Sequence, residues 1–367
     1  MNPPFERVRL FKGSLSVPFR HVSHSQCCLL FLLYNIKMTK KLIPLLFSSV
    51  LKDYIWGGRN LEKLGRELPK DGVIAESWDI AAHKDGTSLV ENGDFAGYSL
   101  TQLQEELGLD LIGENSQWAH ERGKFPLLIK LLDANRPLSV QVHPNDEYAL
   151  KNEGNELGKT EMWVVLHAEA DAEVILGVKA GTSPELFGKA IQQGKLEPFL
   201  HHIPVKKGDH ICVPAGSLHA IMGGLIIAEI QQNSNTTYRV YDWNRLGADG
   251  NPRPLHVDKA LDVTNFAQVE PSLAEPLLIL DEDGVRRLRL CENRYFITEK
   301  VEMDAGATYH GFCSGATMEI WGAIEGQVSV NDLTLNAIRF TLLPAALGEF
   351  TVKAEEKSTL LRTYVGS

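Results

Sequence analysis

The sequence has few of the features that mark secreted, membrane or nucleic-acid-binding proteins. Only five of its 367 residues are cysteine, and no two of them form a C-x-x-C pair. An odd number of cysteines without close pairing argues against a small disulfide-framed scaffold. We therefore expect free thiols in a reducing compartment, at Cys27, Cys28, Cys212, Cys291 and Cys313.

Positive charge is also scarce. The chain carries 37 lysines and arginines against 47 acidic residues, which gives a net charge of −10. A general electrostatic attraction to nucleic acid or to anionic lipid is therefore not expected, and an anionic substrate would need a local positive pocket. The composition, 44% hydrophobic and 23% charged, is that of an ordinary globular protein, and the length suggests about two domains.

Residues 1–37 differ in composition from the rest of the chain. They hold five basic residues against one acid, and one short apolar run at Cys27–Leu33. That run is well below the roughly 20 residues needed to span a bilayer, and no A-x-A cleavage site follows it. Because Met38 offers a second start, we interpret residues 1–37 as an upstream extension from a misassigned start codon. A cleaved export signal is the alternative.

From residue 43 onward, short apolar or alternating runs are separated by Gly, Pro, Asn and Asp. This pattern favours an antiparallel sandwich or barrel, with strands at Leu127–Leu132, Leu138–His143, Met162–Leu166, Glu173–Val178, His210–Val213 and Leu225–Ile230. Two helical insertions interrupt the strands. Residues 99–118 place leucines near helical spacing, and residues 183–200 open with Ser183-Pro184-Glu185, a capping residue followed by proline.

A second strand-rich block runs from about residue 285 to the end. Its predicted strands are Tyr295–Glu302, Met318–Val330, Leu333–Leu343 and Glu349–Val365. The acidic stretch 280–284 reads as a linker, so we expect a domain boundary near 270–285.

A polar stripe on one predicted strand is the first sign of a metal site. Alternation along the strand puts Ser139, Gln141 and His143 on one face and apolar residues on the other. An amide oxygen and an imidazole two residues apart can reach one cation, although a solvent-facing stripe would look the same. Glu161 opens another apolar strand, and an edge carboxylate facing water is the alternative there.

The stretch 208–219 is more specific. It fits the pattern G-x5-P-x-G-x2-H and resembles the second motif of the cupin superfamily, in which a Pro-x-Gly turn aims the last histidine, here His219, into a barrel. We expect His210 to be structural or exposed. Imidazole, carboxylate and amide ligands together suit Zn²⁺, Mn²⁺, Fe²⁺ or Co²⁺, and an open coordination position would serve water or substrate.

Four motifs occur in order along the chain: LSVQVHP at 138–144, KTEMW at 159–163, PAGSLH at 214–219 and NTTYRVYDWN at 235–244. Together they closely resemble the short bacterial type of class I mannose-6-phosphate isomerase, a zinc-dependent, cupin-type family. The resemblance covers residues 40–367 and implies a mostly-β bicupin, two jelly-roll barrels with short helical insertions. We expect a catalytic metal-binding domain over 38–275 and a degenerate cupin-like domain over 280–367, without a second metal site.

The resemblance also implies the site residues. The metal ligands would be Gln141, His143, Glu161 and His219, holding one divalent ion per chain, with zinc favoured by the family. The catalytic arginine would be Arg239, and Lys159 matches a lysine in the active site of relatives. Asn235 departs from some longer relatives, which have Asp there, so an acid/base role at this position is open.

The implied reaction interconverts mannose 6-phosphate and fructose 6-phosphate by proton transfer between C1 and C2 through a cis-enediol. Arg239 would stabilise charge or position the substrate, because a guanidinium stays protonated. Lys159, if removed from water, could carry the proton; Tyr238, Tyr241 and a metal-bound water are weaker candidates.

The other expectations are less defined. For the phosphate we consider Arg136, Lys130 and Arg245, and for the sugar Trp56, Trp78, Trp163 and Trp243, although tryptophans of this kind are more often core residues. A non-catalytic sugar-binding bicupin and a cupin metal-dependent oxygenase are the competing functions. We expect a cytoplasmic enzyme acting on a small sugar phosphate, with no nucleic-acid or membrane partner. The sequence is silent on oligomeric state.

Overall fold

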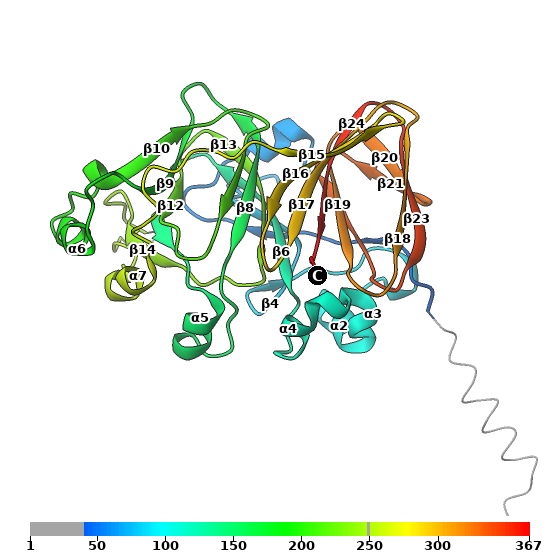
Figure 1. The fold of residues 1–367 in the computed structure, drawn as a ribbon, viewed down its shortest axis with the longest axis horizontal. Coiled ribbons are helices and arrows are strands. Elements are labelled where there is room, and N and C mark those ends of the chain that lie inside the picture. Colours follow the sequence, from blue (N-terminus) through cyan, green and yellow to red (C-terminus); the bar gives the residue numbers. More distant parts are fainter. Residues whose placement is uncertain (1–39, 248–249) are drawn as a thin grey trace, which may run out of the picture. The chain divides into compact units, whose positions relative to one another are not determined.

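The computed structural model describes residues 40–247 and 250–367, and most of its regular structure is β-strand (Figure 1). The expectations for residues 1–37 lie outside the described residues. Residues 41–367 form one compact unit. Within it, the green half of Figure 1 carries the predicted catalytic residues, and we call it the catalytic half. The orange-to-red half carries the C-terminal strands, and we call it the C-terminal half.

The catalytic half contains two main antiparallel sheets. The six-stranded sheet has, in spatial order, β11 (His210–Val213), β8 (Glu161–Ala168), β13 (Leu225–Gln232), β6 (Leu127–Ala134), β3 (Glu76–Ile80) and β2 (Val50–Lys52). The five-stranded sheet has β10 (Leu200–Pro204), β9 (Glu173–Val178), β12 (His219–Ile221), β7 (Val140–Val142) and β14 (Tyr238–Tyr241). A small hairpin joins β4 (Ala82–His83) to β5 (Gly86–Thr87).

The C-terminal half repeats this two-sheet arrangement. Its seven-stranded sheet has the order β1 (Leu45–Leu46), β22 (Arg339–Leu343), β19 (Glu319–Glu325), β24 (Ser358–Tyr364), β17 (Ile297–Met303), β16 (Val285–Glu292) and β15 (Leu277–Glu282). Its four-stranded sheet has β18 (Thr308–Cys313), β23 (Gly348–Ala354), β20 (Gln327–Val330) and β21 (Leu333–Asn336). The predicted mostly-β bicupin architecture is confirmed.

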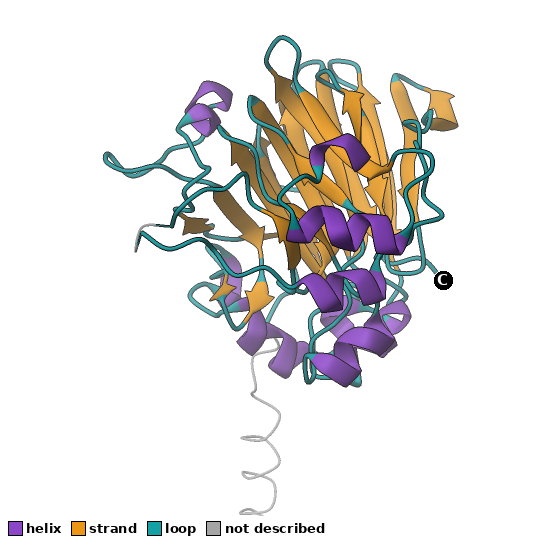
Figure 2. Ribbon diagram, turned by 90° about the vertical axis from the view of Figure 1, so that its left-hand side faces the viewer, coloured by secondary structure: helices purple, strands orange, loops and turns teal. Residues whose placement is uncertain are grey.

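In Figure 1 the helices lie at the left of the strands and below them, and Figure 2 shows several of them in front of the strands. They are α2 (Leu100–Leu107), α3 (Leu109–Ile112), α4 (Gln117–His120), α5 (Asp146–Asn152), α6 (Pro184–Gln192) and α7 (Val257–Val263). Short 3₁₀ turns span Asn60–Leu64, Gly93–Phe95, Glu114–Ser116 and Glu197–Phe199. Both predicted helical insertions are confirmed.

The two longest helices each begin at a capping serine, and Ser183 is the one that the sequence analysis indicates. The Ser99 side chain accepts a hydrogen bond from the Gln102 backbone N–H, and Gln102 returns one, which is a capping box. The Ser183 side chain caps α6 by accepting a hydrogen bond from the Leu186 backbone N–H, with Pro184 at the first helical position.

The six-stranded sheet is buried on both faces. One face forms the interior of the catalytic sandwich, where Leu132, Val165 and Ile227 pack against Val174 of the opposing sheet. The other face, including Ile129, packs in a second cluster with residues of α2 and of the C-terminal sheet. Burial on both sides explains why β6, β8 and β13 are almost continuously apolar, and it makes polar residues on them stand out.

The predicted linker is wrong. Residues 280–282 complete β15, and Asp283 and Gly284 form the tight turn to β16, with φ angles of 51° and 72°. The hairpin adds a strand to the edge of the C-terminal sheet. An acidic, glycine-containing turn and an acidic linker have the same composition, so sequence alone does not separate them.

The expectation of free thiols is wrong at two positions. Cys212 on β11 and Cys291 on β16 form a disulfide, with Cα atoms 6.0 Å apart, whereas Cys313 is a buried free thiol. Residues 79 positions apart meet only in the tertiary structure. Cys27 and Cys28 are outside the described residues. No helix in the described part of the chain is both long and apolar enough to cross a membrane.

Candidate metal centre and active site

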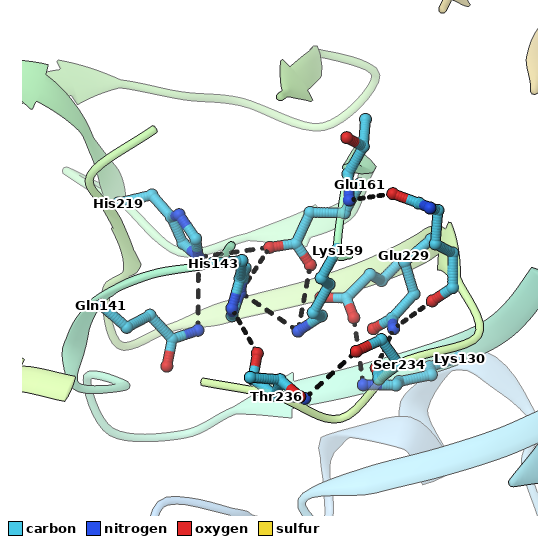
Figure 3. Close-up of polar contacts among 12 residues, drawn as sticks. Lys130, Gln141, His143, Lys159, Glu161, His219, Glu229, Ser234 and Thr236 are labelled. Atoms are coloured by element: carbon cyan, nitrogen blue, oxygen red, sulfur yellow. Dashed lines mark hydrogen bonds and ion pairs between the residues drawn. The ribbon is translucent and has the colours of Figure 1, made fainter. Parts of the chain in front are cut away.

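Three side chains meet inside the catalytic sandwich, one from the residue that follows β7 and two from the first residues of β8 and β12 (Figure 3). His143, Glu161 and His219 each offer one ligand atom, and these atoms all lie within 4.8 Å of one another. Oε1 of Glu161 is 3.1 Å from Nε2 of His143 and 3.2 Å from Nε2 of His219. All three residues are about 1% exposed. The structure thus brings together three of the four ligands that the sequence resemblance implies.

Strand pairing and one tight turn position these side chains. His219 opens β12 and is paired in register with Gln141 on β7, while Glu161 opens β8 in the facing sheet. The turn before β12 contains Gly216 at φ +89°, where a Cβ would lie 2.9 Å from the Val263 carbonyl. The Gly216 backbone N–H donates to the His143 carbonyl. Glycine is therefore required for the turn that holds His219 beside His143.

The hydrogen bonds of the two histidines define their tautomers. Nδ1 of His143 lies 2.8 Å from the Thr236 carbonyl, and Nδ1 of His219 lies 2.9 Å from the Ser217 carbonyl. Because a carbonyl only accepts, each Nδ1 donates, and each Nε2 of a neutral ring presents a lone pair. Backbone partners of this kind commonly orient metal-binding histidines.

The donor set fits a divalent cation. Two imidazole lone pairs face a carboxylate, and within the described residues neither Glu161 oxygen meets a donor with hydrogen-bonding geometry. Acceptors this close repel one another unless a positive charge lies between them. Two nitrogens and one oxygen without a thiolate match a catalytic site with an open position better than a closed structural zinc site.

The electrostatics keep the ligands in the forms that bind metal. Burial, reinforced by the charge of Lys159, lowers the pKa of His143 to about 3, so its ring is neutral. Burial alone would raise the pKa of Glu161, but the charge of Lys159 outweighs it and holds that pKa well below its usual value. A neutral imidazole and an ionised carboxylate are the forms required for coordination.

Gln141 lies beside the three ligands. Its Nε2 is 3.3 Å from Nε2 of His219, and its Oε1 accepts a hydrogen bond from Ser139. A half-turn of the amide would direct the oxygen toward the same centre. Val140 and Val142 on the opposite face of β7 are fully buried, which confirms the predicted alternation.

A cavity of about 290 Å³ adjoins the triad and contains both predicted catalytic residues. Lys159 is 5% exposed, and its Nζ lies 3.2 Å from Nε2 of His143 and 3.4 Å from Oε2 of Glu161. Arg239 is paired with Gln141 across β14 and β7, and its Nε donates to the Ser139 hydroxyl at 3.1 Å. Burial and nearby Arg253 lower the pKa of Arg239, but a guanidinium remains charged.

Glu229 is a cavity residue that the sequence analysis missed. It lies in the middle of β13 and is 3% exposed, and its Oε1 is 3.1 Å from Nζ of Lys130. Burial, with the nearby charge of Glu161, raises the pKa of Glu229. Glu76 lies on the other side of Lys130, at 3.6 Å. A lone carboxylate within the apolar run Leu225–Ile230 is the signal that could have identified Glu229.

Arg253 is a second cavity residue that the sequence analysis missed, and it lies in a cluster with Arg239 and Arg245. Asp242, 6% exposed, binds Arg253 through both carboxylate oxygens at 2.6 and 2.7 Å, and it also binds Arg245. Arg253 and Arg239 both line the cavity. One carboxylate among three arginines leaves an excess of positive charge there. Arg253 follows the recognised motif by nine residues, with no local pattern to mark it.

The remaining predicted binding residues are distributed differently. Among the phosphate candidates, Arg136 is exposed and outside the cavity lining, Lys130 lies between Glu76 and Glu229, and Arg245 is held by Asp242 and the Pro137 carbonyl.

Among the tryptophans, Trp56 lines the cavity, whereas Trp78 and Trp163 are core residues. Trp243 packs against the outer cluster of the five-stranded sheet. Asn235 lines the cavity and donates to Asp85 at 2.9 Å, and His210 is buried, as a structural role requires. Tyr238 is buried and donates to Glu153.

Comparison with known proteins identifies the family. A profile described as "Phosphomannose isomerase type I, catalytic domain" matches residues 45–173. The chain is 41% identical over 267 residues to a mannose-6-phosphate isomerase of Bacillus subtilis, covering 72% of this chain and 81% of that protein. It is also 41% identical over 273 residues to a mannose-6-phosphate isomerase of Streptococcus mutans, covering 72% and 83%.

The fold agrees with this assignment. A crystal structure of the mannose 6-phosphate isomerase from Bacillus subtilis superimposes with a TM-score of 0.77 at 34% identity, covering 87% of this chain and 99% of that chain. The match extends over both halves of the molecule, including the sheets that hold the His143–Glu161–His219 triad. The chain therefore belongs to the type I mannose-6-phosphate isomerase family.

Proposed function

We propose that this protein interconverts mannose 6-phosphate and fructose 6-phosphate, using one bound divalent cation. The observation that carries the proposal is the His143–Glu161–His219 triad, which lies beside a cavity containing Lys159 and Arg239. An aldose–ketose isomerase needs this combination, because it must move a proton from an unactivated C–H bond and stabilise negative charge on the sugar oxygens.

Four side chains would hold the cation: His143, Glu161, His219 and, through its amide oxygen, Gln141. Zinc is the ion that we propose, since mixed nitrogen and oxygen ligands with an open position suit it. When bound, such an ion polarises the sugar carbonyl and stabilises negative charge on its oxygen. The Thr236 and Ser217 carbonyls keep both imidazoles oriented, as second partners of metal-binding histidines do.

We assign the proton transfer between C1 and C2 to Lys159. Its Nζ borders the triad, and its burial excludes bulk water from the position where the proton would move. Glu229 is the alternative carrier, because it lies in the same cavity and burial raises its pKa, so its carboxyl holds a proton more readily than an exposed one. Either group would remove the proton from one carbon to form the enediol and return it to the other carbon.

Arg239 and Arg253 would bind the anionic part of the substrate. The Arg239 guanidinium is oriented by Ser139 through Nε and by the Pro254 carbonyl through Nη1. Asp242 holds Arg253 in a two-point ion pair beside the cavity. Fixed guanidinium groups suit a phosphate, since they bind it without reorganising. A cupin oxygenase or a binding protein for neutral sugars has no need of these cations.

The chemistry suggests a location. Phosphorylated sugars are intermediates of central metabolism inside cells, so we propose that the protein acts in the cytoplasm on this small substrate. No nucleic-acid or membrane partner forms part of the proposal.

The direct test is an assay of the purified full chain with mannose 6-phosphate. Fructose 6-phosphate should form, turnover should stop after prolonged treatment with a chelator, and added Zn²⁺ should restore it. Metal analysis of the untreated protein should find about one divalent ion per chain. Absence of turnover with mannose 6-phosphate in the protein reloaded with Zn²⁺, Mn²⁺, Co²⁺ and Fe²⁺ in turn would refute the proposal.

A further inference from the structure

The disulfide joins two sheets that belong to different halves of the molecule. Cys212 is on β11, at the edge of the six-stranded catalytic sheet, and Cys291 is on β16 of the C-terminal sheet. Their Cα atoms are 6.0 Å apart, within the usual range for two cysteines that can bond without backbone movement. The pair is preformed by the packing of the two sheets.

The bond encloses the segment that carries much of the active site. The two cysteines are 79 positions apart, and His219, Glu229 and Arg239 lie between them. Cys212 is followed on β11 by Val213, which pairs in register with Glu161. The turn after β11 donates from Ala215 N–H to the Thr160 hydroxyl. A disulfide at Cys212 therefore restrains β11, the strand that leads into the turn before His219.

The two sulfurs differ in access. Cys291 is 4% exposed, but Cys212 is partly exposed, so a small thiol or disulfide has one sulfur to attack. The reduced form is also accommodated, because the Cys212 thiol can donate to the Leu290 carbonyl at 3.6 Å. One sulfur of the pair is accessible, and its thiol has a hydrogen-bond acceptor when reduced. The disulfide can therefore be both formed and reduced.

We propose that Cys212 and Cys291 form a reversible disulfide between the catalytic and C-terminal halves. We call this pair the redox clasp: it is open when both residues are thiols and closed when the disulfide is formed.

To close the clasp, one thiolate attacks a low-molecular-weight disulfide such as oxidised glutathione, releasing one reduced glutathione and leaving a mixed disulfide. The second thiolate then attacks the protein sulfur of that mixed disulfide and releases a second glutathione. Overall, two protein thiols are oxidised and one glutathione disulfide is reduced. The cytoplasmic thiol pool keeps the clasp open, and oxidative conditions close it. The inference does not depend on the reaction catalysed.

Formation of the disulfide should stabilise the fold, because the bond restricts the unfolded chain over a long loop.

To test this, the full chain is equilibrated with oxidised or with reduced glutathione, alkylated, digested and mapped by mass spectrometry. The oxidised sample should yield a linked Cys212–Cys291 peptide, and reduction should remove it. The oxidised protein should melt about 3–6 °C above the reduced protein, by circular dichroism with matched metal content.

Two variants make the test specific. Cys212→Ala should abolish the difference in melting temperature between oxidised and reduced samples, whereas Cys313→Ala should retain it. Cys313 is a matched control because it is buried and burial raises the pKa of its thiol to about 12, so it is inert to exchange. The inference is overturned if no linked peptide forms, or if Cys212→Ala keeps the difference. Because peptide mapping identifies each sulfur, Cys27 and Cys28 do not confuse the result.

Discussion

Nζ of Lys130 lies 3.1 Å from Oε1 of Glu229, and the two residues face each other in register across β6 and β13. Both are almost completely buried in a wall of the cavity beside the metal ligands. Burial of a charge in a strand made for an apolar core is costly unless it is paired. Glu76 adds a second carboxylate, so this group carries one cation and two acids.

Replacing Glu229 should separate catalysis from metal binding. In Glu229→Gln the amide keeps the size of the side chain but cannot carry a proton. If Glu229 takes part in proton transfer, kcat should fall by about 10²–10⁴ while the bound metal stays at the wild-type level. Steady-state kinetics and metal analysis of the same preparation are the measurements. Glu173→Gln, a partly exposed carboxylate at the start of β9 and outside the cavity lining, is the control. A kcat within a factor of three of wild type would assign the proton to Lys159 alone.

The ligand and arginine variants should fail in different ways. His143→Ala removes one of three converging ligands, so metal and activity should be lost together, with activity down by more than about 100-fold. Arg239→Ala should retain the metal and lose activity, because the guanidinium contacts Ser139 rather than the ligands through its Nε. Metal content and kcat/KM of both proteins are compared with Arg59→Ala, a partly exposed arginine paired with Glu62. Full activity in Arg239→Ala would contradict its assigned role.

Arg253 should act on the phosphate. Removal of a charged hydrogen-bonding partner costs about 1.5–3 kcal/mol, so Arg253→Ala should raise KM for mannose 6-phosphate about 10- to 100-fold, with a smaller effect on kcat. Competitive inhibition by inorganic phosphate should weaken in parallel. Arg253→Lys keeps the charge but loses the two-point pair with Asp242. Its KM should therefore lie between those of the wild type and Arg253→Ala. An unchanged KM in Arg253→Ala would remove it from the binding site.

Acid should destabilise the protein partly through Glu156. A hydrogen bond with His83, supported by Lys84 and opposed by burial, lowers the pKa of Glu156 to about 2. In the unfolded chain this carboxyl titrates near its ordinary value of 4.5. Between these values the unfolded state binds more protons, so the stabilisation is complete above pH 4.5 and is lost as the pH falls toward 2.

Melting temperatures at pH 5, 4 and 3 test this contribution. The wild type should lose stability more steeply than Glu156→Gln over this range, so the difference between them should shrink as the pH falls. Glu147→Gln, an exposed carboxylate on α5, should follow the wild-type slope. A wild-type advantage over Glu156→Gln that is the same at pH 5 and pH 3 would contradict the assignment.

The sequence by itself determined the local features and the residue types of the metal centre. Alternation along residues 138–143, the capping serine at 183, and the glycine turn before His219 act over a few residues, so their patterns are readable without coordinates. The motifs also contain the ligand types themselves, and their resemblance to one family is enough to group them.

Only the tertiary structure decided which distant side chains meet. Glu229 acquires its raised pKa from burial and from Glu161 on a neighbouring strand, and Arg253 reaches the cavity through its pairing with Asp242. Cys212 and Cys291 become partners because β11 packs against β16. In each case the interaction is set by the distance between atoms, which depends on how sheets pack, and chain patterns of a few residues carry no record of that distance.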